Sequence, residues 1–126
     1  MTHPHMLRIE IDAPSRAYAV LVGSGALAHV GAALNEAGFG ASRFVVSSPT
    51  VMGFWGEPLH DALPESMPIV VPDGERHKTL GVVNRIYDAL LKAGADRSAG
   101  LVTFGGGVIG DMGGFAAATY MRGIRL

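Results

Sequence analysis

The fold is decided by the stretch Leu101-Val102-Thr103-Phe104-Gly105-Gly106-Gly107-Val108-Ile109-Gly110-Asp111. An apolar run with strand character stops at three consecutive glycines, and an alanine-rich segment with a helical pattern follows. This order predicts a strand, a tight turn and the N-terminus of a helix. Backbone N–H groups and the positive end of the helix dipole converge at such a turn, where no Cβ blocks a ligand. The stretch therefore predicts a binding site for a phosphate or pyrophosphate.

The glycine spacing Gly105-x-Gly107-x-x-Gly110 satisfies the dinucleotide-binding pattern in its strand-to-helix context. The acidic residue that binds the ribose, expected about 20 residues further on, would lie beyond Leu126. A P-loop is excluded because no Gly-Lys-Ser/Thr follows. In a second interpretation, Gly113 and Gly114 only let the helix pack closely on a sheet. The spacing by itself leaves both interpretations open.

A second polar stretch, Pro72-Asp73-Gly74-Glu75-Arg76-His77-Lys78, follows the apolar strand candidate 68–71. In open α/β sheets, ligands bind outside the carboxyl ends of the strands, which is where this loop would lie. A Pro-Asp-Gly turn followed by a charged first helical turn explains the same residues without a ligand. The residues alone favour neither explanation.

The rest of the chain alternates between strand and helix patterns. Leu7, Ile9 and Ile11 alternate with polar residues, which predicts a half-buried strand that pairs in a hairpin with Tyr18–Val22. Further strands are predicted at 44–46, 68–71 and 101–104, and helices at 26–37, 51–63 and 78–93. The pattern predicts an α/β fold: a mostly parallel sheet with helices on both faces and an N-terminal β-hairpin.

The helix predicted over 78–93 has the clearest amphipathic pattern, and Gly94 follows it as a C-terminal signal. Its expected buried face consists of Leu80, Val83, Ile86, Leu90 and Ala93.

Composition narrows the functional class. The 126 residues amount to one domain. A net charge of −1 does not provide the basic surface that nucleic-acid binding requires. The absence of cysteine excludes disulfides and thiolate metal sites. Neither a signal peptide nor an apolar run of membrane-spanning length is visible, so we expect a soluble cytoplasmic protein that does not bind membranes.

No metal site or catalytic triad is indicated by the residues. The five histidines, His3, His5, His29, His60 and His77, lack metal-ligand spacing. A new apolar stretch begins at Gly123-Ile124-Arg125-Leu126 just after a helix ends, so we expect the chain to be part of a larger fold.

Taken together, the loop from Asp73 to Lys78, the glycine stretch and its continuation Gly114-Phe115-Ala116-Ala117-Ala118-Thr119-Tyr120-Met121-Arg122-Gly123 resemble 3-dehydroquinate synthase. Related sugar-phosphate cyclases, such as the inosose and valiolone synthases, share much of this motif. The resemblance implies a Rossmann-like N-terminal NAD-binding domain, here residues 1–126 and incomplete, with a helical C-terminal domain outside this chain. It also implies a homodimer.

The family implies an NAD-dependent and metal-dependent lyase of the shikimate pathway, in aromatic amino acid biosynthesis. Its members convert the phosphosugar 3-deoxy-arabino-heptulosonate 7-phosphate to 3-dehydroquinate and phosphate. They do so by transient oxidation with NAD, β-elimination of phosphate, re-reduction and an intramolecular aldol step. The cofactor carries the redox chemistry, while the protein supplies position and electrostatics.

The resemblance also assigns individual residues. Twelve would line the NAD site: Asp73, Gly74, Glu75, Arg76, His77, Lys78, Gly106, Gly107, Val108, Ile109, Gly110 and Asp111. Arg122 matches an arginine that reaches the substrate phosphate of the neighbouring subunit, although a cation favoured by a helix C-terminus is the alternative explanation. The family's catalytic lysines and the Glu and two His ligands of its zinc or cobalt ion fall after Leu126. This chain alone would therefore hold no catalytic residue and no metal ligand, and we expect it to be inactive.

Ser48 departs from the family pattern, which has Asp or Asn at this position for the adenosine ribose. Three alternatives stay open. The chain could come from another cyclase, from a metal-dependent polyol dehydrogenase with a similar glycine motif, or from a non-catalytic nucleotide-binding module.

Overall fold

The computed structural model describes residues 6–126, and residues 1–5, with His3 and His5, lie outside the described part. In chain order the elements are β1 (Leu7–Ala13), β2 (Arg16–Val22), the 3-10 helix η1 (Ala26–His29), α1 (Val30–Glu36), β3 (Arg43–Ser47), α2 (Pro49–Ala62), β4 (Met67–Val70), the 3-10 helix η2 (Glu75–His77), α3 (Leu80–Lys92), β5 (Gly100–Phe104), α4 (Gly107–Thr119) and the 3-10 helix η3 (Tyr120–Arg122). Within the described part, no helix has the length and hydropathy that crossing a membrane requires.

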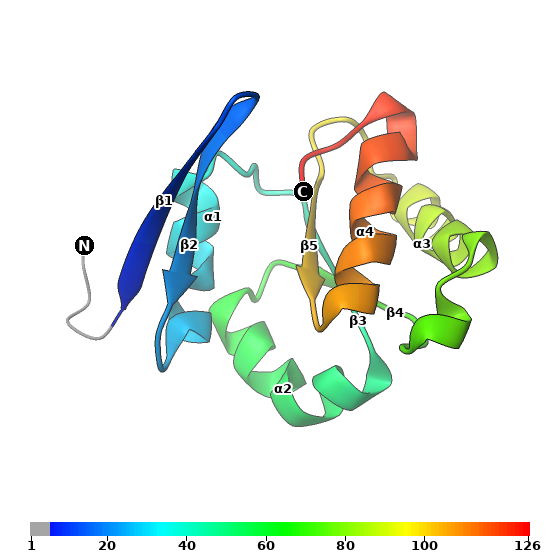
Figure 1. Cartoon of the computed structure of the whole chain (residues 1–126). Coiled ribbons are helices and arrows are strands. Elements are labelled where there is room, and N and C mark those ends of the chain that lie inside the picture. Colours follow the sequence, from blue (N-terminus) through cyan, green and yellow to red (C-terminus); the bar gives the residue numbers. More distant parts are fainter. Residues whose placement is uncertain (1–5) are drawn as a thin grey trace.

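Strands β3, β4 and β5 form a parallel sheet in the order β4-β3-β5 (Figure 1). In the central strand, Val46 pairs with Ile69 on one side and with Thr103 on the other. The sheet order extends one step past β5, because Arg125 forms a parallel bridge with Gly100 and its carbonyl accepts a hydrogen bond from Leu101 N at 2.8 Å. The predicted parallel sheet is confirmed.

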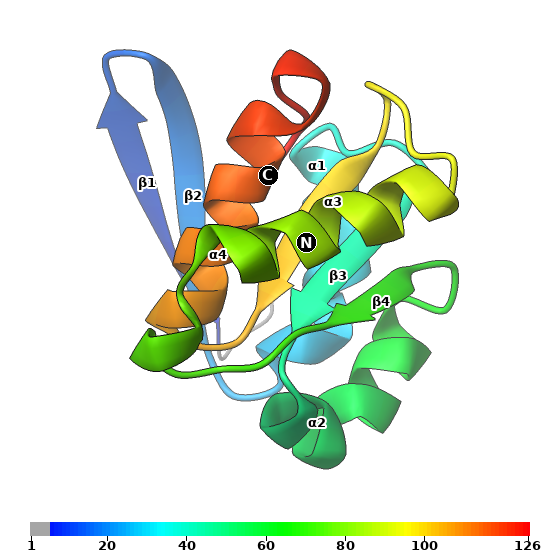
Figure 2. The same ribbon diagram turned by 90° about the vertical axis from the view of Figure 1, so that its right-hand side faces the viewer.

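Helices cover both faces of this sheet, because successive strand residues point to opposite sides. Phe44 and Val46 pack in a core with α3 and α4, whereas Val45 packs in a second core with Leu59 and Leu63 of α2. Figure 2 shows α3 and α4 in front of the strands and α1 behind them. The α/β architecture predicted from the alternating pattern is therefore correct.

Helix α4 lies very close to the sheet, and Gly113 is the residue that permits this approach. A Cβ built on Gly113 would lie 2.2 Å from Cγ2 of Thr103 on β5. A Cβ on Gly114 would lie 3.4 Å from Leu126 Cδ2, which is ordinary contact. The packing explanation is therefore correct for Gly113, whereas nothing crowds Gly114.

Helix α3, predicted over 78–93, runs from Leu80 to Lys92, and its buried face also differs from the prediction. Thr79 Oγ1 accepts a hydrogen bond from Val82 N at 3.2 Å, and Gly94 closes the helix with φ 71°. Leu80 is 73% exposed and Ala93 is exposed as well, so both predictions of burial were wrong. Leu80 is the first helical residue, and packing on the sheet begins two positions later. The buried residues of α3 are Val82, Val83, Ile86 and Leu90.

The single helix predicted over 26–37 is instead a 3-10 turn, η1, followed by the short helix α1. Gly25 adopts φ 78°, a left-handed conformation that glycine reaches without a Cβ clash. The bonds from Ala26 N to Gly23 O and from Ala28 N to Gly25 O span three residues, which tightens the first turn into a 3-10 helix.

Strands β1 and β2 form the predicted antiparallel hairpin, in which Leu7 pairs with Val22 and Ile9 pairs with Val20. These four side chains share one face of the hairpin and are all exposed, from 39% for Val20 to 60% for Leu7. The prediction of a half-buried strand is therefore wrong for Leu7 and Ile9, whereas Ile11 is half-buried. No described element covers the apolar face, because the hairpin turns its other face towards α1.

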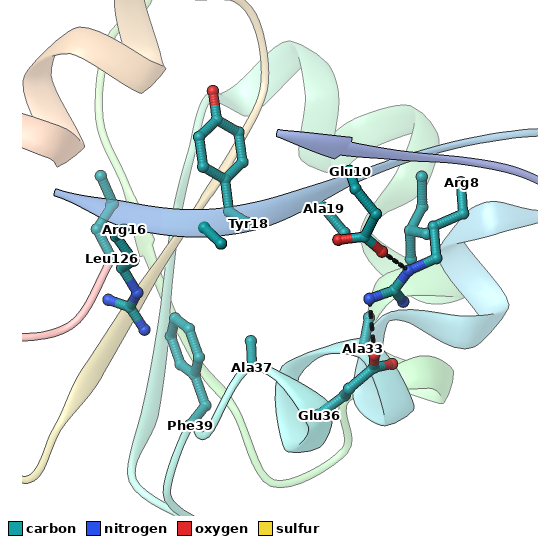
Figure 3. A pocket seen from close by; sticks show the side chains of 12 residues that line it. Arg8, Glu10, Arg16, Tyr18, Ala19, Ala33, Glu36, Ala37, Phe39 and Leu126 are labelled. Atoms are coloured by element: carbon teal, nitrogen blue, oxygen red, sulfur yellow. Dashed lines mark hydrogen bonds and ion pairs between the residues drawn. The ribbon is translucent and has the colours of Figure 1, made fainter. Parts of the chain in front are cut away.

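The inner face of the hairpin borders a groove of 630 Å³ whose other wall is α1 (Figure 3). Arg8 joins the two walls, since it hydrogen-bonds Glu10 on β1 and its Nη2 lies 2.8 Å from Glu36 Oε1 on α1. Both contacts raise the pKa of Arg8, and the hydrogen bond with Glu10 has the larger effect. The hairpin is thus attached to the helical layer by charged groups rather than by an apolar core.

Candidate nucleotide-binding site

The two motifs singled out in the sequence lie at the same edge of the sheet. Strand β4 ends at Val70 and leads into the loop that contains Asp73, while β5 ends at Phe104 and leads into the glycine turn. Both strands are parallel to β3, so their carboxyl ends point the same way. This edge is where open α/β sheets bind their ligands.

The glycine turn leads directly into α4 and leaves its N-terminus open. Gly106 is the N-cap residue, and in the described part of the chain no side chain caps this end. The first intrahelical bond runs from Gly110 N to Gly106 O at 3.0 Å. The N–H groups of Gly107, Val108 and Ile109 precede that bond, and the first N–H groups of a helix have no partner within it. They are therefore suited to hold an anion.

The glycines of this turn differ in the space around them. A Cβ on Gly106, Gly107 or Gly110 would meet no described atom within 4 Å, whereas one on Gly105 would lie 3.1 Å from Ile109 Cγ1. The Ile109 side chain is fully buried, so it can contribute to a ligand site only through its backbone. Open space in front of free N–H donors fits the pyrophosphate of a dinucleotide.

The second motif forms a compact turn. Asp73 Oδ1 accepts a hydrogen bond from Gly74 N at 2.7 Å, and Gly74 has φ 102°, which favours glycine. The 3-10 helix η2 follows, in which Arg76 Nε donates to His77 Nε2 at 3.1 Å. Asp73 therefore stabilises the loop itself, while Glu75 remains mostly exposed.

Lys78 joins the two motifs. Its Nζ lies 2.6 Å from Oδ2 of Asp111 on α4 and 3.8 Å from Oε1 of Glu75. The hydrogen bond to Asp111 is the largest of the effects that raise the pKa of Lys78, so the ammonium stays charged. The structure thus brings the end of the 73–78 loop and the second turn of α4 together at the open helix N-terminus.

The two serines at the end of β3 are both fully buried and have structural partners. Ser48 Oγ accepts a hydrogen bond from Val51 N at 3.3 Å and caps α2. Ser47 Oγ donates to the Phe104 carbonyl at 2.6 Å and so fixes the residue that precedes the glycine turn. Sequence reasoning missed Ser47, although a hydroxyl at the end of an apolar strand was the available signal.

Arg122 lies far from the glycine turn of its own chain. Helix α4 ends at Thr119, and its 13 residues span about 20 Å at the usual rise of a helix. Met121 and Arg122 both have positive φ, 49° and 65°, which is uncommon for residues with a side chain. The turn is anchored by Tyr120, whose hydroxyl donates to Ala95 O at 2.7 Å. Arg122 is held exposed, and no ion pair engages it among residues 6–126.

Within the described part, no group of three or more His, Asp or Glu side chains is arranged to hold a metal ion.

Known proteins are similar to this chain in the region of both motifs and beyond it. Residues 68–126, which contain both motifs, match the family model described as 3-dehydroquinate synthase N-terminal. The chain is 44% identical over 121 residues to 3-dehydroquinate synthase of Syntrophotalea carbinolica, covering 93% of this chain and 33% of that protein. Its identity to the synthase of Gloeobacter violaceus is 42%, over 96% of this chain and 35% of that protein. The chain thus spans about a third of the length of these curated relatives.

Solved structures agree on the fold. A 2-deoxy-scyllo-inosose synthase complexed with carbaglucose-6-phosphate, NAD⁺ and Co²⁺ matches 94% of this chain and 33% of its own length, with a TM-score of 0.82 at 23% identity. The 2-epi-5-epi-valiolone synthase of Streptomyces hygroscopicus, with NAD⁺ and Zn²⁺ bound, matches 67% of this chain and 25% of its own length, with a TM-score of 0.62 at 31% identity. The Rossmann-like fold is confirmed. The resemblance recognised from the sequence is confirmed too, because residues 68–126 match the 3-dehydroquinate synthase N-terminal model and the chain is similar to curated 3-dehydroquinate synthases along nearly its whole length.

Proposed function

We propose that this chain binds NAD⁺ across the carboxyl edge of its sheet. The observation that carries the proposal is the contact of Lys78 with Asp111, because it joins two sequence motifs that are otherwise separated by a whole helix and strand. The residues proposed to contact the cofactor are Asp73, Gly74, Glu75, Arg76, His77, Lys78, Gly106, Gly107, Val108, Ile109, Gly110 and Asp111. Residues 1–126 then act as the N-terminal NAD-binding domain.

The pyrophosphate would lie against the N-terminus of α4. Three N–H donors and the helix dipole favour its charge there, and the missing side chains of Gly106 and Gly107 leave room for it. Lys78 supplies a cation at the same edge, already oriented by Asp111. When bound, NAD⁺ supplies reversible hydride transfer, while these residues bind and orient it.

The proposed activity is that of 3-dehydroquinate synthase, a lyase of the shikimate pathway. Its reaction converts 3-deoxy-arabino-heptulosonate 7-phosphate to 3-dehydroquinate and phosphate. Support comes from relatives of that name at 36–44% identity along nearly the whole chain. We place the catalytic residues and the ligands of a zinc or cobalt ion outside this chain, and the protein in the cytoplasm.

Arg122 is proposed to bind the substrate phosphate of a neighbouring subunit in a homodimer. A guanidinium fork suits a phosphate, and the turn of residues 120–123 presents it to solvent. Because α4 separates Arg122 from the glycine turn by about 20 Å, its guanidinium does not contact a ligand at the glycine turn of its own chain.

A second candidate activity is that of a related sugar-phosphate cyclase. Its support is the match of the fold to 2-deoxy-scyllo-inosose synthase over 94% of the chain. The two activities are distinguished by incubating the full-length protein separately with 3-deoxy-arabino-heptulosonate 7-phosphate, with a hexose phosphate and with a heptulose phosphate. Release of phosphate from the heptulosonate alone supports the synthase, and turnover of a hexose phosphate or heptulose phosphate supports the alternative.

The proposal that NAD⁺ binds at the glycine turn is tested by substitutions that add a methyl group which would contact a bound ligand but no described atom of the protein. Gly106→Ala and Gly107→Ala should leave folding intact, because the added Cβ meets no described atom within 4 Å. Both should weaken NAD⁺ binding by at least about fivefold, since overpacking against a ligand costs on the order of 1 kcal/mol or more. Calorimetric titration of the full-length protein measures this. The control is Gly53→Ala on the exposed side of α2, which is equally open. Unchanged affinity in the two glycine-turn variants would contradict the site.

A further inference from the structure

A second polar hollow lies at the opposite end of β5 from the glycine turn. It has a volume of 390 Å³ and is lined by Arg16, Arg97, Gly123, Ile124 and Arg125. Three segments far apart in the sequence meet here: the tip of the hairpin, the connection between α3 and β5, and the last residues, which bridge to Gly100 at the start of β5. None of the described residues that line it is acidic.

Two of the three arginines that line this hollow, Arg16 and Arg97, form no ion pair within the described part of the chain. The carboxylate next to Arg97 in sequence belongs to Asp96, and its Oδ1 accepts hydrogen bonds from the N–H and hydroxyl of Ser98 at 2.9 and 2.5 Å. Three arginines therefore line one hollow, and among residues 6–126 no acidic residue lines it with them.

Arg125 is fixed in place before any ligand arrives. Its Nη1 donates to Ala37 O at 2.9 Å, and its guanidinium carbon lies 5.9 Å from the centre of the Phe39 ring. A guanidinium carries five N–H donors, so others remain for a ligand. Figure 3 shows Arg16 beside Leu126 and directed towards Phe39, the ring that the Arg125 guanidinium also approaches. The arginine that is already ordered reduces the entropy lost on binding.

We propose that the hollow formed by Arg16, Arg97 and Arg125 binds a phosphate group, at a site separate from the glycine turn. Guanidinium groups bind phosphate and carboxylate alike through paired N–H donors. Three of them around one hollow exceed what the two oxygens of a carboxylate can accept, whereas a phosphate offers three or four. The site does not depend on the proposed NAD site, because β5 separates the two.

The test is calorimetric titration of the full-length protein with inorganic phosphate. Wild type is compared with Arg16→Gln, Arg97→Gln and the control Arg85→Gln, an exposed arginine on α3 outside the hollow. Arg125 is left intact because it also holds Ala37 and Phe39. Removing either lining arginine should weaken one phosphate site per chain by about fivefold, and Arg85→Gln should leave it unchanged. Any phosphate bound elsewhere persists equally in all variants and cancels in the comparison.

Two results overturn the proposal: phosphate binding that is the same in Arg16→Gln and Arg97→Gln as in wild type, or a loss that is equally large in Arg85→Gln. A further titration, with glucose 6-phosphate and with glucose, distinguishes a phosphorylated metabolite from inorganic phosphate as the ligand. Glucose 6-phosphate that binds more tightly than inorganic phosphate, with this binding weakened in Arg16→Gln and Arg97→Gln but not in Arg85→Gln and with no binding of glucose, indicates a phosphorylated metabolite in the hollow. Equal affinities indicate that inorganic phosphate is sufficient.

Discussion

Lys78 Nζ lies 2.6 Å from Oδ2 of Asp111, and this contact connects the loop after β4 to the second turn of α4. Both side chains belong to motifs at the carboxyl edge of the sheet, and both remain partly exposed. The pair therefore lies where a nucleotide would approach, and it holds the lysine in one orientation without removing it from solvent.

Lys78→Met should weaken NAD⁺ binding to the full-length protein by about fivefold to tenfold, because it removes a cation at the proposed cofactor site. Asp111→Asn should have a smaller effect, since the lysine stays but is no longer held by a charged partner. Titration calorimetry of the two single variants and the double variant gives the coupling between them. Lys92→Met, at the exposed end of α3, is the matched control. If the Lys78 and Lys92 variants bind NAD⁺ equally well, Lys78 is not part of the site.

Gly113→Ala should destabilise the fold by about 1–3 kcal/mol, because the new methyl would lie 2.2 Å from Cγ2 of Thr103 in a packed layer. Adding Thr103→Ser removes that methyl and should restore most of the loss. Gly53→Ala, where nothing crowds the added methyl, should instead stabilise by up to about 1 kcal/mol through helix propensity. Urea denaturation measures all four proteins. Equal stability of Gly113→Ala and Gly53→Ala would show that α4 does not need a glycine for its close approach.

Much of the fold follows from local patterns, because periodicity and turn residues are local properties. The apolar run that ends at Gly105 and the helical pattern that ends at Gly94 correctly gave β5 and α3. Burial is a tertiary property, which is why the predictions failed for Leu80 and for the hairpin face of Leu7 and Ile9. Alternation shows which residues share a face, but it does not show whether another element covers that face.

In the candidate site, too, the local features could be predicted from the sequence and the contacts between distant residues could not. The sequence identified both motifs, and the structure placed them at one edge, which no spacing along the chain could establish. The sequence could point to the Ser47 hydroxyl but not to its partner, the Phe104 carbonyl, because the two residues are 57 positions apart.

Ser48→Ala should lower the free energy of unfolding by about 1 kcal/mol, because the hydroxyl caps α2. NAD⁺ affinity should not change, since the buried hydroxyl already has a partner in Val51 N. Thr79→Ala, which removes the equivalent cap of α3, gives the expected size of the effect. Denaturant titration and calorimetry of the full-length protein separate the two properties. A loss of NAD⁺ affinity with unchanged stability would assign Ser48 to the ribose instead.

Asp96 should make stability depend on pH in the acidic range. Hydrogen bonds from the Ser98 hydroxyl and N–H lower the pKa of Asp96 below its ordinary value of 3.8. A carboxylate with a lowered pKa in the folded state stabilises the fold above pH 3.8, and this contribution is lost as the pH falls through the folded-state pKa. Asp96→Asn keeps an acceptor oxygen but cannot titrate. The stability difference between wild type and this variant should shrink on acidification, and a constant difference would contradict the assignment.

The exposed apolar face of the hairpin should limit the solubility of the 126-residue chain. Leu7, Ile9, Val20 and Val22 lie side by side on it and are 39–60% exposed. Large exposed apolar patches promote association. Replacing Ile9 and Val20 by lysine should raise the concentration at which the chain precipitates, with only a small change in unfolding free energy, because both side chains are already exposed to solvent. Lysines at Ala17 and Ala19, on the face towards α1, are the matched control and should give no such gain at equal net charge. Equal gains in both variants would mean that charge alone, and not the apolar face, governs solubility.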